Sequence, residues 1–157
     1  MALIPPHYLD CVVAIGTKQN GIEQWMGTGF LFGFKDDNLN PDTYTLYLVT
    51  NKHVFKGFNR VCVRFNPQNG QPAKVYDLDL ESNGKKIYKQ HPNSNVDVAV
   101  AMINAQLLQA DNIQFAYFRC DQDCYCLSDL RSIQVTEGDG IFALGYPMGN
   151  VGTNRHM

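Results

Sequence analysis

The sequence contains no long apolar run and no apolar leader at its start. None of its 157 residues belong to a stretch that approaches the roughly 18 consecutive apolar residues of a membrane-spanning helix. Residues Met1 to Gly16 also lack the basic segment and the long apolar segment that together mark a secretory signal peptide. The sequence therefore predicts a protein that does not cross a membrane and that is cytoplasmic.

An excess of positive charge is absent as well. The chain has 13 Lys and Arg residues against 15 Asp and Glu residues, which gives a formal net charge of -2. Nucleic-acid-binding domains are normally basic, and no run of Lys or Arg indicates a membrane- or phosphate-binding patch. We therefore expect no nucleic-acid partner and no membrane partner. Because 45% of the residues are hydrophobic and only 18% are charged, the chain is expected to fold around a core.

Cysteines are few, and their number is odd. The chain has five of them, at Cys11, Cys62, Cys120, Cys124 and Cys126. An odd number without a leader does not fit the disulfide framework of a small secreted domain. Cys11 and Cys62 lie in apolar, strand-like runs, which favours free buried thiols.

The other three cysteines form the pattern Cys120-x3-Cys124-x-Cys126, which leaves three alternatives open. They could form a zinc site with Asp121, Asp123 or a distant His as the fourth ligand, they could pair by oxidation, or they could lie in a plain connector. Structural zinc usually takes four ligands, often in Cys-x2–4-Cys pairs. The connector is therefore favoured, and we expect no metal and no cofactor.

Short strand-like runs separated by turn residues make up most of the sequence. These runs cover Cys11–Ile15, Gly27–Phe34, Tyr44–Val49, Val61–Phe65, Lys74–Leu80, Val96–Ile103 and Gly140–Leu144. Only Ala105–Ala110 and the turn around His53 favour helix. Several short strands at such spacing are typical of a barrel or a sandwich, so the sequence predicts an all-β protein.

Two residues carry chemistry that a strand end could position. His53 follows the run Tyr44–Val49 after a short turn, and an imidazole has a pKa that suits a general base. Asp97 precedes an apolar run, where a partly desolvated carboxylate needs a donor such as a histidine ring N–H. Taken alone, each residue is more often structural: a hydrogen-bonded surface histidine and a charge at a strand end.

Two glycine motifs accompany these residues. Gly27-Thr28-Gly29-Phe30 places glycines inside a strand, which indicates a bulge or a close backbone approach, here to the turn that bears His53. Gly145-Tyr146-Pro147 follows the last apolar run and, by itself, indicates only a strand and a turn.

In this order, the motifs Gly-Thr-Gly-Phe, Leu-Val-Thr-Asn-Lys-His-Val, Asp-Val-Ala-Val and Gly-Tyr-Pro make the chain from Cys11 to Gly149 resemble the trypsin-like peptidases, above all their bacterial HtrA-like branch. The resemblance implies peptide-bond hydrolysis of a protein or peptide substrate, with His53 as the base and Asp97 as the acid that orients it. It also implies a first six-stranded Greek-key β-barrel over residues 8–118, followed by a connector and the start of a second β-barrel over residues 119–157.

The nucleophile that the resemblance requires is missing. The signature Gly-Asn/Asp-Ser-Gly-Gly does not occur, and none of Ser82, Ser94, Ser128 and Ser132 has flanking glycines. No cysteine lies in a Gly-x-Cys-Gly context either. Base and acid without a nucleophile cannot form an acyl-enzyme, so the sequence predicts an inactive amino-terminal fragment of a serine peptidase.

Two alternatives to a simple truncation remain open. The chain could be a binding or regulatory domain that kept the barrel and lost catalysis. It could also be one half of a split or cleaved peptidase, completed by self-association or by a second chain.

Overall fold

The computed structural model describes residues 4–35, 43–66 and 72–146. The longer strands are β1 (Val12–Gln19), β2 (Ile22–Lys35), β3 (Tyr44–Thr50), β4 (Arg60–Phe65), β5 (Lys74–Asp79) and β9 (Ala99–Met102). The two-residue strands are β6 (Glu81–Ser82), β7 (Lys85–Lys86), β8 (Lys89–Gln90) and β10 (Phe118–Arg119). The helices are α1 (Pro6–Leu9), α2 (Lys52–Phe55), α3 (Ala105–Ala110) and α4 (Leu127–Ser132).

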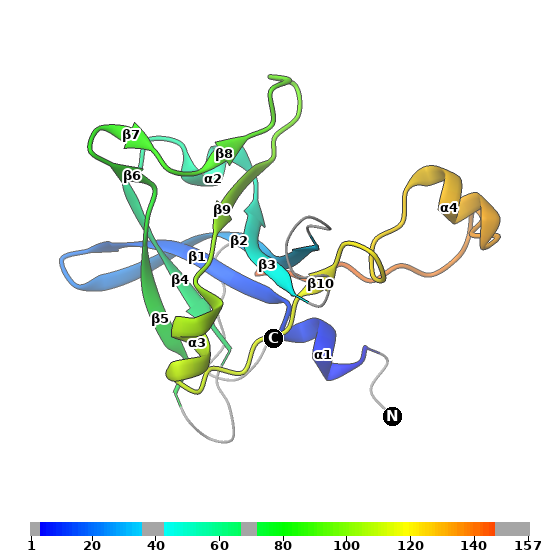
Figure 1. Ribbon diagram of the computed structural model, residues 1–157, viewed down its shortest axis with the longest axis horizontal. Helices are drawn as coiled ribbons and strands as arrows, with labels where there is room; N and C mark the ends of the chain where they lie inside the picture. Colours follow the sequence, from blue (N-terminus) through cyan, green and yellow to red (C-terminus); the bar gives the residue numbers. More distant parts are fainter. Residues whose placement is uncertain (1–3, 36–42, 67–71, 147–157) are drawn as a thin grey trace.

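The main sheet has the strand order β5-β4-β1-β2-β3-β9-β8, and every neighbouring pair along it is antiparallel. It curls strongly into a half-barrel, as Figure 1 shows, and β10 pairs with β2 in parallel off this path. The predicted all-β class is confirmed. The longer strands are rich in β-branched and aromatic residues, which pack well on a pleated surface.

The core lies inside the curl. Val61, Val63 and Phe65, which the alternation in the sequence places on one face of β4, all belong to it, together with Leu48 of β3 and Phe55 of α2. The opposite face of β4 is buried as well, because Cys62 is 1% exposed. Cys11 and Cys62 are free and buried, as predicted.

The glycines of β2 permit the close approaches that the sequence predicts. A Cβ atom at Gly27 would lie 2.8 Å from Val54 Cγ2, in the helix that bears His53. A Cβ atom at Gly29 would lie 2.5 Å from Leu48 Cδ1. The pairing of β1 with β2 also shifts register between Ile15 and Gly16, opposite Gly27. Both readings of the motif, a bulge and a close approach, are therefore confirmed.

Replacing Gly29 with alanine is expected to lower the free energy of unfolding by about 1–3 kcal/mol, because the added methyl group overpacks a filled core. Gly140→Ala is the matched control, since a Cβ atom there meets nothing within 4 Å. Urea unfolding followed by circular dichroism compares the two variants. Equal stability of both would show that β2 tolerates a side chain at position 29.

The carboxyl-terminal region differs from the prediction. Residues 140–144 form no strand, and Ile141 is 90% exposed. An isolated strand is not stable, because its backbone groups need a partner strand, and no described strand pairs with this segment. Helix α4 instead occupies part of the predicted connector and stands apart from the half-barrel (Figure 1).

The division at residue 118/119 stays a prediction, and Pro147 and residues 148–157 lie outside the described part of the chain. In the described ranges, no helix is long and apolar enough to cross a membrane.

Candidate functional site

The pairing of β3 with β9 brings His53 and Asp97 together. The two strands are antiparallel, and the last residue of β3, Thr50, lies opposite the first residue of β9, Ala99. His53 follows Thr50 within α2, while Asp97 shortly precedes Ala99. Because one strand ends where the other begins, both residues lie at the same end of the sheet.

The two side chains are in direct contact. His53 Nδ1 lies 2.6 Å from Asp97 Oδ2, and the backbone N–H of His53 donates to Asp97 Oδ1 over 3.1 Å. The carboxylate is therefore held by both the ring and the backbone of one residue. This separation is within the hydrogen-bond reach that a base and its orienting acid require.

Three further hydrogen bonds fix the turn that carries His53. Asn51 Nδ2 donates to the Asp97 carbonyl over 2.8 Å, and Lys52 Nζ donates to the Asn93 carbonyl over 2.8 Å. Thr50 Oγ1 donates to the Thr28 carbonyl of β2, also over 2.8 Å. These positioning residues were not assigned from the sequence, although Asn51 and Thr50 lie within the quoted Thr-Asn-Lys-His motif.

The electrostatics favour an ionised Asp97. The hydrogen bond from His53 is the main cause that lowers the pKa of the Asp97 carboxyl below its ordinary value of 3.8. An ionised carboxylate can only accept hydrogen bonds, so Nδ1 carries the proton in this contact. In the neutral ring, Nε2 is then the acceptor, which is the state that a general base needs.

This contact gives a pH-dependent signal. We expect the Asp97 carboxyl to titrate below pH 3.8, and its pKa to rise in a His53→Ala variant because the main stabilising hydrogen bond is lost. The contribution of the contact to stability is fully present above pH 3.8 and is lost as the pH falls through the folded pKa.

Carboxyl carbon NMR shifts measure this titration. Asp123 is the internal control, because its pKa is lowered chiefly by Arg119 and should not respond to the variant. An Asp97 pKa that is unchanged in His53→Ala would mean that the two side chains do not interact in solution.

The dyad is open to solvent. The His53 side chain is 68% exposed and that of Asp97 is 47% exposed. Within the described ranges, no serine hydroxyl hydrogen bonds to His53; Ser128 Oγ and Ser132 Oγ bond instead to Cys126 Sγ and the Asp129 carbonyl. The described residues thus bring an imidazole and a carboxylate into contact at an exposed position.

The family model described as Mycoplasma immunoglobulin protease matches residues 10–117, a stretch that contains both His53 and Asp97. The chain belongs to this family. No curated protein and no solved structure matches it. The matched stretch runs from β1 through α3, so the family region coincides with the curled sheet that carries the dyad and excludes α4.

The carboxyl-terminal segment of this family member docks beside the glycine motif. The backbone N–H of Tyr146 donates to Thr28 Oγ1 over 2.8 Å, and the Tyr146 hydroxyl donates to Asn66 Oδ1 over 2.6 Å. Tyr146 is 4% exposed, and burial raises the pKa of its hydroxyl to about 12. Thr28 therefore contacts both this segment and, through its carbonyl, the turn that leads to His53.

The cysteine cluster does not form a metal centre in the part of the chain that the structure describes. No three His, Cys, Asp or Glu side chains lie together there as metal ligands would. Cys120, Cys124 and Cys126 are free thiols. Cys120 Sγ instead accepts from the Lys35 backbone N–H over 3.3 Å, which ties the segment after β10 to β2.

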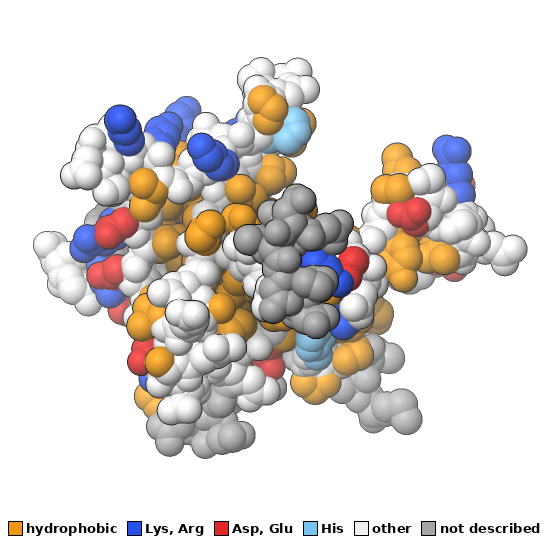
Figure 2. Space-filling view, viewed as in Figure 1, with side chains coloured by type: hydrophobic (Ala, Val, Ile, Leu, Met, Phe, Trp, Pro, Cys, Tyr) orange, Lys and Arg blue, Asp and Glu red, His pale blue; other side chains and the backbone are white. Residues whose placement is uncertain are grey.

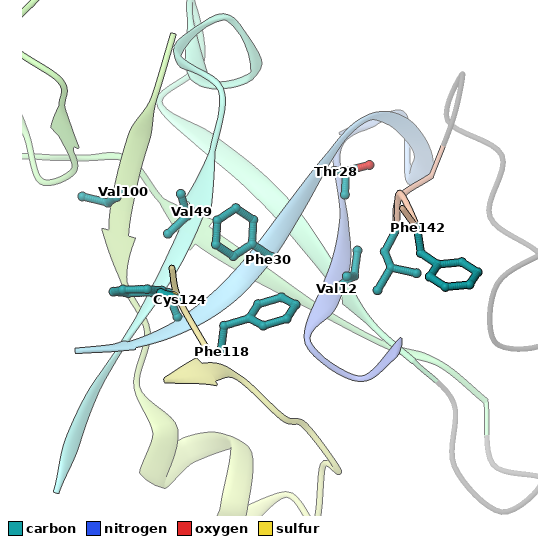
Figure 3. Close-up of a pocket in the computed structure, with 10 residues that line it drawn as sticks. Val12, Thr28, Phe30, Val49, Val100, Phe118, Cys124 and Phe142 are labelled. Atoms are coloured by element: carbon teal, nitrogen blue, oxygen red, sulfur yellow. The ribbon is translucent and has the colours of Figure 1, made fainter. Parts of the chain in front are cut away.

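The outer face of the sheet carries an apolar hollow of about 550 Å³ (Figure 3). Phe30, Val49 and Val100 line it, and their chain neighbours Leu31, Leu48 and Ala99 lie in the core. Successive residues of a strand point to opposite faces, so the sheet is apolar on both sides at this point. Phe118, Cys124 and Phe142 of the later segment also line the hollow.

Proposed function

We propose that this chain supplies the base and the orienting acid of a trypsin-like serine peptidase. The observation that carries the proposal is the 2.6 Å contact between His53 Nδ1 and Asp97 Oδ2, within a chain that belongs to a protease family. The order of the motifs, resembling the bacterial trypsin-like peptidases, supports the serine type. Exposure of the His53 ring supports a role at a reacting surface.

In this mechanism, His53 Nε2 accepts the hydroxyl proton of a serine as the serine oxygen bonds to the carbonyl carbon of the substrate. Asp97 keeps the ring in the tautomer that presents Nε2 and stabilises the imidazolium that forms. The same proton then passes to the nitrogen of the leaving amine as the C–N bond breaks. Water repeats the sequence on the acyl-enzyme and releases the acid product.

In this arrangement the nucleophilic serine lies on polypeptide beyond these 157 residues, because no Gly-x-Ser-Gly occurs among them. Residues 8–118 then form the first barrel unit, and residues 119–157 lead into a second unit that carries the nucleophile. The apolar hollow on the outer face of the sheet supports this arrangement, because it offers a surface on which a second unit could pack. The family's description suggests immunoglobulins as the substrate class.

Labelling with a fluorophosphonate probe tests the proposal. The 157-residue chain should remain unlabelled, whereas a product of the same gene that continues into a Gly-x-Ser-Gly segment should be labelled, and its His53→Ala variant should be labelled far more slowly. Labelling of the short chain would reveal a nucleophile among its own serines. A longer product that contains Gly-x-Ser-Gly and resists labelling would instead favour a binding or regulatory domain that lost catalysis.

A further inference from the structure

Five lysines gather around the helix that carries His53. Lys52 begins α2 and Lys56 follows its last residue. Lys85 and Lys86 form β7, and Lys89 begins β8. We call these five residues the lysine surface. All except the half-buried Lys52 are exposed. Figure 2 shows Lys and Arg side chains grouped along the upper edge of the molecule, where Figure 1 places α2, β7 and β8.

Packing between the two segments makes this surface continuous with the dyad. The ring of Phe55 in α2 meets the ring of Tyr88, between β7 and β8, with centroids 5.1 Å apart and an edge-on geometry. On the other side, Lys52 Nζ bonds to the Asn93 carbonyl, in the turn that leads to Asp97. The lysine surface therefore borders the base and the acid directly.

The positive charge of this surface is not neutralised within the described part of the chain. No ion pair there involves any of the five lysines, whereas Lys18, Lys35, Arg60 and Arg119 each have an Asp partner. Lys86 Nζ instead lies 5.6 Å from the Tyr88 ring centroid.

Two carboxylates lie nearby. Glu81 is opposite Lys86 in the β6–β7 pair, and Asp97 is engaged by His53. Although the chain has a net charge of -2, this cluster of positive charges creates a local positive potential that attracts an acidic partner.

We propose that the lysine surface binds an acidic segment of the protein substrate beside the scissile bond. This inference rests on the proposed peptidase function, because the partner is identified as a polypeptide that must reach His53. An extended peptide advances about 3.3 Å per residue, so a few residues on either side of the reacting bond suffice to cross from the dyad onto β7 and β8. Acidic side chains there would form charge-assisted hydrogen bonds with the lysines.

Binding to the unmodified chain tests this directly by fluorescence anisotropy. The probe is a fluorescein-labelled peptide of about twelve residues that alternates glutamate with glycine, and its control carries glutamine in place of glutamate. The variant replaces Lys85, Lys86 and Lys89 with glutamine. The matched control replaces Lys18, Lys35 and Lys74 with glutamine, which removes the same formal charge elsewhere on the surface.

We expect the glutamate peptide to lose at least about tenfold in affinity in the first variant and less than about threefold in the control variant. Binding should also weaken as salt is raised, because salt screens exposed charges. Circular dichroism of each variant checks that the substitutions leave the fold intact.

Equal affinity of the glutamine peptide, or of the first variant, would overturn the proposal. So would tighter, lysine-dependent binding of a single-stranded RNA of the same length, which would make this a nucleic-acid surface. The test is independent of catalysis, because it measures binding to a chain in which no Gly-x-Ser-Gly segment occurs. Peptide binding without probe labelling of the longer product would therefore contradict the peptidase function alone.

Discussion

Replacing His53 with alanine should lower kcat by about 10⁴- to 10⁶-fold in a polypeptide that joins this chain to a Gly-x-Ser-Gly segment. In the proposed mechanism Nε2 takes the serine proton, and the 2.6 Å contact between Nδ1 and Asp97 Oδ2 orients the ring for that step. Hydrolysis of a peptide or ester substrate under single-turnover conditions measures the acylation step directly.

The control for this prediction is His7→Ala, because His7 lies in α1 and its ring packs on Tyr8, 5.3 Å away between centroids. That variant should retain activity within about twofold. Asp97→Asn should also reduce kcat, by about 10⁴-fold, since an amide stabilises the wrong tautomer of the ring. A His53→Ala enzyme that kept more than about a tenth of the activity would exclude His53 as the base.

Replacing Phe55 with alanine should lower the free energy of unfolding by about 3–5 kcal/mol. Phe55 is 0% exposed, and its ring contacts Tyr88 in an edge-on pair. The truncation would leave a cavity between α2 and the β7–β8 segment. Because a four-residue helix has little stability of its own, the loss should also loosen the turn that bears His53.

Urea denaturation gives the stability change, and Phe142→Ala is the control because that side chain is 63% exposed. The control should change stability by less than about 1 kcal/mol. Amide hydrogen exchange at residues 52–56 reports on the turn itself. A Phe55→Ala protein of undiminished stability would mean that α2 is not anchored through this ring.

The dyad could be predicted from the sequence because its geometry follows from strand order. His53 follows the run that becomes β3 and Asp97 precedes the run that becomes β9, so antiparallel pairing of these strands places both residues at the same end of the sheet. The glycines of β2 predicted a close approach for a similar reason. Val54 and Leu48 pack so closely against the strand that no room is left for a Cβ atom at these glycines.

The remaining features depend on contacts that no local pattern records. The apolar run at 140–144 predicts a strand from its composition. A strand forms only when a partner strand pairs with it, and no described strand pairs with this run. The lysine surface could not be predicted from the sequence, because its members are scattered from position 52 to position 89 and are brought together by the packing of Phe55 on Tyr88. The contact of Thr28 with the carboxyl-terminal segment likewise depends on Tyr146, which lies far along the chain.

The hydrogen bond between Thr28 and Tyr146 spans 118 positions of sequence, so it can form only late in the synthesis of this chain. A ribosome releases the chain from its amino terminus, so β1 to β9, with His53 and Asp97 already paired, can fold before Tyr146 has emerged. Tyr146 can close onto this preformed sheet only later, as a non-local contact that forms slowly. In the newly made chain, His53 and Asp97 can therefore be in contact before Tyr146 has bonded to Thr28 of the glycine strand.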